Sequence, residues 1–152
     1  MDKREQLSHL ISRHMMTLVA SYAKLLDNSL TAPQYLILQS LARQDMQTSS
    51  YFAGMLDVTL SAITNLTGKL VQKGYVERIA SETDRRQVFL RITDQGRAVE
   101  EQMLERYRVL TDGVWDDFSD KELSLLISSY EKMIGNLERQ SGNGKQEYAR
   151  KL

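Results

Sequence analysis

The chain has 152 residues, which is enough for one domain with a buried hydrophobic core. Its hydrophobic fraction of 41% and charged fraction of 26% are ordinary for a globular protein, which excludes a disordered or fibrous chain. The net charge is zero and there is no cysteine, so disulfides, thiolate catalysis, zinc–thiolate sites and a cysteine-based oxidation sensor are excluded.

The N-terminal segment is predicted to form one long amphipathic helix from Glu5 to Asp27. Its apolar side chains recur at helical spacing: Leu7, Leu10, Ile11, Met15, Leu18, Val19, Tyr22 and Leu25. Charged residues interrupt the first twenty positions, so the segment lacks the apolar run of a signal peptide or a membrane span. We therefore expect a cytoplasmic protein with no membrane partner.

Start signals for a second helix follow. Thr31 is a capping residue, Pro33 is an early proline, and Gln34 stands three positions after the threonine. These signals predict a helix that runs to about Ala42.

Two further capped runs predict a helix-turn-helix. The first, within residues 48–56, is capped by Thr48 or Ser49. Residues 57–59 interrupt it, and the second helix then runs to Gly74, which suits a C-terminal cap. At 100° per residue, four small and polar residues of this helix fall opposite its apolar side, namely Ser61, Asn65, Gly68 and Gln72. Thr64 and Lys69 flank them.

After Gly74 the hydrophobic period changes from helical to alternating. Val76 and Ile79 lie in one short run, and Val88, Leu90 and Ile92 lie in another, which predicts two strands. The polar connector at 81–86 is too long for a two-residue turn, so its tip should project as the wing of a winged helix.

Two long helices are predicted after the strands, one opening at Thr93 and one at the capping box of Ser119 and Glu122. The fold class is therefore mainly α with a small antiparallel β wing, a winged helix-turn-helix with long N- and C-terminal dimerisation helices. The predicted divisions are a dimerisation helix at 1–29, a DNA-binding domain at 30–93, two dimerisation helices at 94–140 and a flexible tail at 141–152.

Charge is segregated along the chain although its sum is zero. From Lys69 to Arg91 there are six basic and three acidic residues, a net charge of +3. From Asp94 to Arg139 there are six basic and eleven acidic residues, a net charge of −5. This basic segment covers part of the second helix of the helix-turn-helix and the wing. Its position favours a nucleic-acid partner.

The order of elements and five local strings resemble the MarR family over nearly the whole chain. The strings are Leu30–Leu38, Ser61–Asn65, Lys73–Val76, Asp84–Arg86 and Leu90–Gly96. The most specific combination is the lysine-glycine-aromatic-valine strand entry, followed by Asp-x-Arg and by a threonine-x-x-glycine helix start. The second helix of the predicted helix-turn-helix lacks the arginine that many relatives carry, having Asn65 and Thr67 in that region, which weakens the case for bidentate guanine contacts from it.

The resemblance implies a transcriptional regulator, by default a repressor, that binds double-stranded DNA at a palindromic operator as a homodimer. It implies that Arg86 enters the minor groove and that Asp84 helps to hold the wing. Arg85 would substitute for Arg86 or assist it. The slim polar helix face would enter the major groove. The candidate base and phosphate contacts on it are Ser61, Thr64, Asn65 and Lys69. Relatives often respond to phenolic or other small lipophilic effectors.

The long terminal helices must bury their apolar stripes, which predicts that they interlock with those of a second chain. A two-fold dimer would hold its two recognition helices about 34 Å apart, one turn of DNA. An effector bound between the dimer helices and the winged domain would favour one distance between the two winged domains of the dimer.

Other readings of the sequence stay open. The protein could be a winged-helix protein–protein interaction module, or a constitutive DNA binder without an effector. The mid-chain bases could be an ordinary solvated surface, and Asp84 with Arg86 a simple salt bridge within a turn. We find no catalytic or cofactor motif. We therefore expect no cofactor and no enzyme. His9 and His14 point about 140° apart around a helix, so we expect no metal site between them.

Overall fold

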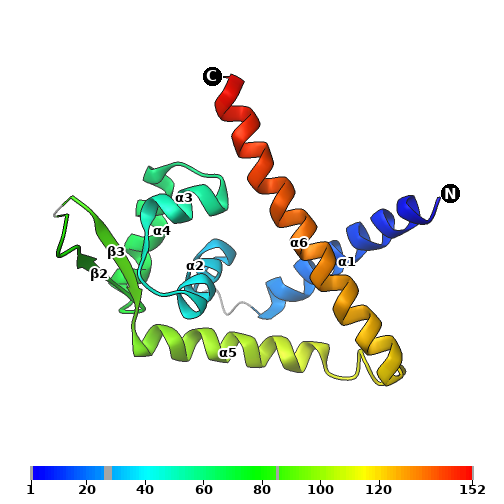
Figure 1. Ribbon diagram of the computed structural model, residues 1–152. Helices are drawn as coiled ribbons and strands as arrows, with labels where there is room; N and C mark the ends of the chain where they lie inside the picture. The colour runs from blue at the N-terminus through cyan, green and yellow to red at the C-terminus, as the bar shows by residue number, and fades with distance from the viewer. Residues whose placement is uncertain (1, 26–28, 85, 152) are drawn as a thin grey trace. The chain divides into compact units, whose positions relative to one another are not determined.

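The computed structural model describes residues 2–25, 29–84 and 86–151 (Figure 1). The chain divides into two compact units, residues 1–110 and residues 111–152. The elements, in chain order, are α1 (Lys3–Leu25), α2 (Ala32–Arg43), β1 (Gln47–Thr48), α3 (Ser49–Leu56), α4 (Leu60–Gln72), β2 (Val76–Ala80), β3 (Val88–Ile92), α5 (Asp94–Thr111) and α6 (Asp120–Lys151).

The winged helix-turn-helix predicted from the sequence is confirmed. Helices α2, α3 and α4 precede an antiparallel hairpin of β2 and β3, which Figure 1 shows extending away from the helices. The sequence did not predict β1, which pairs with β3 on the side away from β2, giving the strand order β1-β3-β2. A strand of two residues is too short to show any alternation, so it leaves no periodic signal in the sequence.

The core of the first unit forms where α2, α3 and α4 pack with one face of the sheet. Its fully buried side chains are Ile37, Leu38, Leu41, Phe52, Ile63, Leu70, Val76 and Leu90. Val76 and Leu90 share a sheet face because alternate residues of a strand point to the same side and antiparallel partners point together. Burial of these faces fixes how α4 and the hairpin lie relative to one another.

Local capping positions the two helices of the helix-turn-helix. The Thr48 hydroxyl accepts a hydrogen bond from the Tyr51 amide, and the Thr59 hydroxyl accepts one from the Ala62 amide, both at 3.2 Å. Between them Asp57 adopts a left-handed conformation with φ of 54°, which ends α3. The caps expected at Thr48 and at the start of α4 are thus present.

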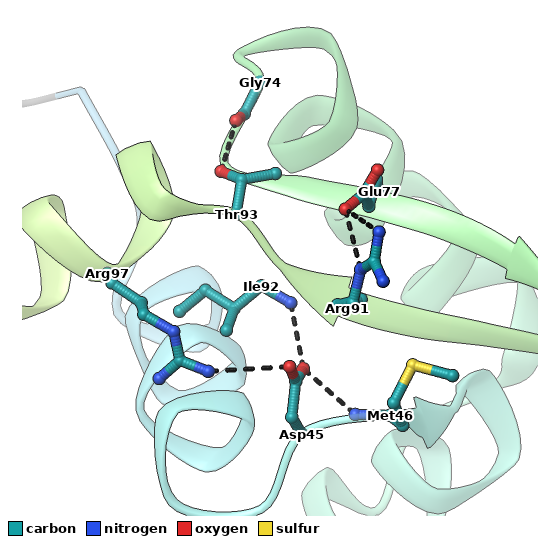
Figure 2. A network of polar contacts seen from close by, with 8 residues as sticks. All are labelled: Asp45, Met46, Gly74, Glu77, Arg91, Ile92, Thr93 and Arg97. Atoms are coloured by element: carbon teal, nitrogen blue, oxygen red, sulfur yellow. Dashed lines mark hydrogen bonds and ion pairs between the residues drawn. The ribbon is translucent and has the colours of Figure 1, made fainter.

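The turn from α4 into β2 closes as the sequence predicts, with Gly74 in a left-handed conformation at φ of 77°. The Gly74 amide donates to the Val71 carbonyl at 2.9 Å and the Tyr75 amide donates to the Leu70 carbonyl at 3.0 Å, the Schellman arrangement. Figure 2 shows the Thr93 hydroxyl donating to the Gly74 carbonyl at 2.6 Å. The same hydroxyl accepts from the Gly96 amide at 3.0 Å and so caps α5.

Asp45 joins the end of α2 to the end of β3 and the start of α5 (Figure 2). One carboxylate oxygen accepts hydrogen bonds from the amides of Met46 and Ile92, both at 3.0 Å. The other lies 3.5 Å from a guanidinium nitrogen of Arg97. Met46 has φ of 61°, so the carboxylate also holds a left-handed turn on a residue other than glycine.

Replacing Asp45 by alanine should lower the free energy of unfolding by about 1–3 kcal/mol, because the half-buried Ile92 amide loses its acceptor. Chemical denaturation measures the change. Glu77→Ala is the matched control: it removes an exposed carboxylate that pairs with Arg91 at 2.8 Å, and should cost less than about 1 kcal/mol. Equal costs for the two variants would contradict the role of Asp45.

The terminal helices differ from their predicted bounds. Helix α1 spans Lys3–Leu25 where the sequence predicts Glu5 to Asp27, and residues 26–28 lie outside the described residues. Helix α6 continues to Lys151, through the segment at 141–151 that we predicted as a flexible tail. The residues from 145 to 151 are mostly good helix formers, which favours the continuation. No helix in the described parts of the chain is both long and apolar enough to cross a membrane.

Candidate nucleic-acid interface

One side of α4 is buried and the opposite side is free. Ile63, Thr67 and Leu70 face the core, and Gln34 of α2 donates from its side-chain amide to the Leu66 carbonyl at 3.3 Å. The predicted contact residues all lie on the exposed side: Ser61, Thr64, Asn65 and Lys69. The structure therefore brings these four residues together on one accessible helix surface.

Most of these side chains are free for an external partner. The Thr64 hydroxyl donates to the Leu60 carbonyl at 2.9 Å, so its oxygen can still accept a hydrogen bond from an external partner. The side chains of Ser61, Asn65 and Lys69 make no hydrogen bond or ion pair with any residue that the structure describes. The surface thus presents hydroxyl and amide groups together with one cation.

The wing is held in shape by hydrogen bonds within its own loop. The Ser81 hydroxyl accepts from the Asp84 amide at 3.1 Å, and the Ser81 amide donates to the Gln87 carbonyl at 2.9 Å. A carboxylate oxygen of Asp84 accepts from the backbone amide of Arg86 at 3.0 Å. The expected residue Arg85 lies outside the described residues.

The contact between Asp84 and Arg86 therefore uses a backbone amide, and it differs from the salt bridge that the sequence left open. The guanidinium of Arg86 is exposed and makes no ion pair within the described parts of the chain. A short side chain that bonds the amide two residues on is typical of an Asx-turn. Asp84 can thus shape the loop while the Arg86 side chain stays available.

A further cation, for which the sequence predicts no role, lies beside α4. Arg78 of β2 is exposed, and its Nη2 would lie 4.0 Å from a Cβ atom placed on Gly68. The cue in the sequence is the register of β2, which puts Arg78 on the same sheet face as Val76. Its nearness to Gly68 depends on how the sheet packs against α4.

Glu100 is a buried acid on α5. Burial raises the pKa of its carboxyl, and repulsion from Glu101 raises it further, whereas Arg43 and Arg97 lower it. Arg97 also contacts Asp45, so Glu100 and Asp45 share this arginine at the junction between α2 and α5. In the described residues no group of three or more His, Asp or Glu side chains is arranged to hold a metal ion.

Known proteins match this chain in sequence and in structure. The sequence profile of the MarR family matches residues 30–88, from just before α2 to the first residue of β3. YpoP, an HTH-type transcriptional regulator of Bacillus subtilis strain 168, is 33% identical over 110 residues, which are 72% of this chain and 78% of the relative. The chain belongs to the MarR family.

Two solved structures extend the similarity to the fold of this MarR-family chain. A MarR family protein from Bacillus stearothermophilus is 25% identical, with a TM-score of 0.80 over 91% of this chain and 99% of that one. FabT of Streptococcus pneumoniae, solved in complex with DNA, is 24% identical, with a TM-score of 0.73 over the same shares. As a member of the MarR family, the protein is a DNA-binding transcriptional regulator and not an enzyme.

Proposed function

We propose that this MarR-family regulator represses transcription as a homodimer on a palindromic operator and that a small lipophilic or phenolic effector modulates its affinity for DNA. The observation that carries the proposal is the exposed polar surface of α4 beside a self-supported wing, on which the Arg86 guanidinium has no partner among the residues that the structure describes. We also propose a cytoplasmic location, because a regulator of chromosomal genes acts in the cytoplasm.

In this proposal α4 enters the major groove. Ser61, Thr64 and Asn65 reach base edges, and an asparagine amide is suited to the N6 and N7 positions of adenine. Lys69, at the flank of the face, binds a phosphate. No arginine stands on this face to read guanine, so we expect operator half-sites in which adenine and thymine dominate the contacts of α4.

The wing then enters the adjacent minor groove. A guanidinium is attracted by the negative potential of a narrow minor groove, and that of Arg86 is exposed and has no ion-pair partner in the part of the chain that the structure describes. Asp84 keeps the loop in shape through the Arg86 amide. We assign Arg85 an assisting role, as the resemblance implies.

Apolar surface on the terminal helices supports dimerisation through segments 1–29 and 94–140. On α1, Met16 is 73% exposed and Val19 is 66% exposed, and a shallow groove runs between Ile11 and Met16. On α6, Leu125 is 67% exposed and Ile127 is 61% exposed. Large side chains of this kind on two helices are suited to burial against a second copy. A two-fold dimer would set its recognition helices about 34 Å apart.

A pulldown of genomic fragments by the purified protein, followed by sequencing, tests the proposed function. Enrichment of palindromic sites whose halves lie one DNA turn apart is the expected result. Gel shifts on an enriched site then vary salt and add salicylate as a phenolic probe. Absence of salt-sensitive binding to any fragment would favour the protein–protein module, and binding that phenolic compounds never alter would favour a constitutive DNA binder.

Lys69→Ala should reduce the slope of log K against log [salt] by about one phosphate's worth, since the lysine is proposed to neutralise one phosphate. Fluorescence anisotropy on an enriched site over a range of NaCl concentrations measures the slope. Lys73→Ala, which removes a charge from the turn after α4, serves as the comparison and should change it less. An unchanged slope in Lys69→Ala would remove this phosphate contact from the proposal.

A further inference from the structure

Arg78 extends from the sheet toward α4. It stands opposite Leu90 in the antiparallel register, and its side chain leaves the sheet on the face that packs against the helix. Val76 and Leu90 are buried on this face, whereas Arg78, nearer the wing, is exposed. Its guanidinium makes no hydrogen bond or ion pair with any residue in the described ranges.

The guanidinium of Arg78 lies beside Gly68 of α4. A Cβ atom at Gly68 would lie 4.0 Å from Nη2 of Arg78, so the arginine head lies over the bare backbone of α4. Gly68 follows Thr64 by one turn, so the guanidinium lies at the edge of the exposed polar face.

We propose that Arg78 binds a phosphate of the DNA strand that separates the major groove entered by α4 from the minor groove entered by the wing. The inference rests on the proposed function. Strand β2 follows α4 directly and leads into the wing, so Arg78 lies between the two groove-binding elements. One sugar-phosphate backbone runs between adjacent grooves of a duplex, and an exposed, unpaired guanidinium suits a phosphate.

Arg91 provides a matched comparison on the same sheet. It stands opposite Glu77 on the other sheet face, and its guanidinium pairs with the Glu77 carboxylate at 2.8 Å. Loss of either arginine changes the net charge by the same amount, so any long-range electrostatic effect on DNA binding is similar. Of these two arginines, Arg78 is the one beside α4 and the one whose guanidinium has no partner among the described residues.

Fluorescence anisotropy tests the proposal with Arg78→Gln and Arg91→Gln on two 30-base-pair duplexes, one with an enriched site and one with the same bases scrambled. Arg78→Gln should weaken binding to both duplexes about tenfold and reduce the salt slope by about one, because a phosphate contact carries no sequence information. Arg91→Gln should change the affinity less than about twofold. Arg78→Lys should restore most of the binding, since a lysine still supplies the charge.

Ethylation interference locates the contact on the DNA. With the wild-type protein, neutralising one phosphate per half-site between the two contacted grooves should weaken binding. In Arg78→Gln that phosphate should no longer matter, while the other interfering phosphates remain. Circular dichroism checks that the variants are folded. If Arg78→Gln is not folded, the interference patterns of the wild-type protein and of Arg91→Gln still test the position of the phosphate.

Two failures are distinguishable. If the wild-type protein binds both duplexes equally or neither, the proposed function fails. If it prefers the enriched site but Arg78→Gln and Arg91→Gln have equal affinities and identical interference patterns, the Arg78 contact is overturned and the proposed function stands.

Discussion

Replacing Gly96 by alanine is expected to lower the free energy of unfolding by about 3 kcal/mol, the upper end of the usual cost of overpacking. A Cβ atom at Gly96 would lie 2.1 Å from the Tyr75 carbonyl oxygen and 2.9 Å from Cγ1 of Ile92. The oxygen belongs to the backbone and accepts a hydrogen bond from the Thr93 amide at 3.1 Å, so it cannot move without breaking the junction. The added methyl group must therefore displace α5 from the end of the hairpin.

Chemical denaturation followed by circular dichroism measures this loss. Gly68→Ala is the matched control, because the same methyl group there would meet only an ordinary contact at 4.0 Å, and alanine is the better helix former. We expect Gly68→Ala to be neutral or up to about 1 kcal/mol more stable. A Gly96→Ala protein as stable as the wild type would show that α5 need not approach Tyr75 so closely.

Replacing Arg86 by alanine is expected to weaken binding to an enriched operator site by about 1–3 kcal/mol, or about 5- to 150-fold in Kd. The guanidinium is exposed and unpaired among the described residues, so the free protein loses no internal contact. The Arg86 amide still donates to Asp84, which preserves the loop. The loss should therefore fall on DNA binding and leave stability almost unchanged.

Anisotropy titrations and thermal unfolding of the same preparations separate these two effects. Arg91→Ala removes an equal charge from a residue that is paired with Glu77, and we expect it to weaken binding far less. A site with guanine–cytosine pairs in place of adenine–thymine pairs under the wing, which put the guanine 2-amino group into the minor groove, should lower wild-type affinity more than that of Arg86→Ala. If Arg86→Ala and Arg91→Ala bind equally well, the wing has no direct role in recognition.

Most elements of the first unit could be predicted because their signals are local. Thr48 and Thr59 cap helices through their own hydroxyls, and Gly74 ends α4 through its own backbone conformation. The exposed side of α4 follows from helical periodicity alone. That is why Ser61 and Asn65 were found on the accessible surface that the sequence predicts.

Contacts between distant segments carried no comparable signal. Asp45 bonds an amide 47 positions away, and nothing near it in the sequence indicates that partner. Strand β1 exists only because β3 passes beside it. Arg78 could be placed on a strand from its alternation, but its position over Gly68 depends on the packing of the sheet against α4.

The sequence by itself thus determined the order of the elements, their caps and the polar face of α4, since each depends on residues within a few positions of one another. Only the tertiary structure decided which charged groups are already paired. It unites Arg91 with Glu77 and leaves Arg78 and Arg86 exposed, because strand register and packing bring together residues that the chain holds apart.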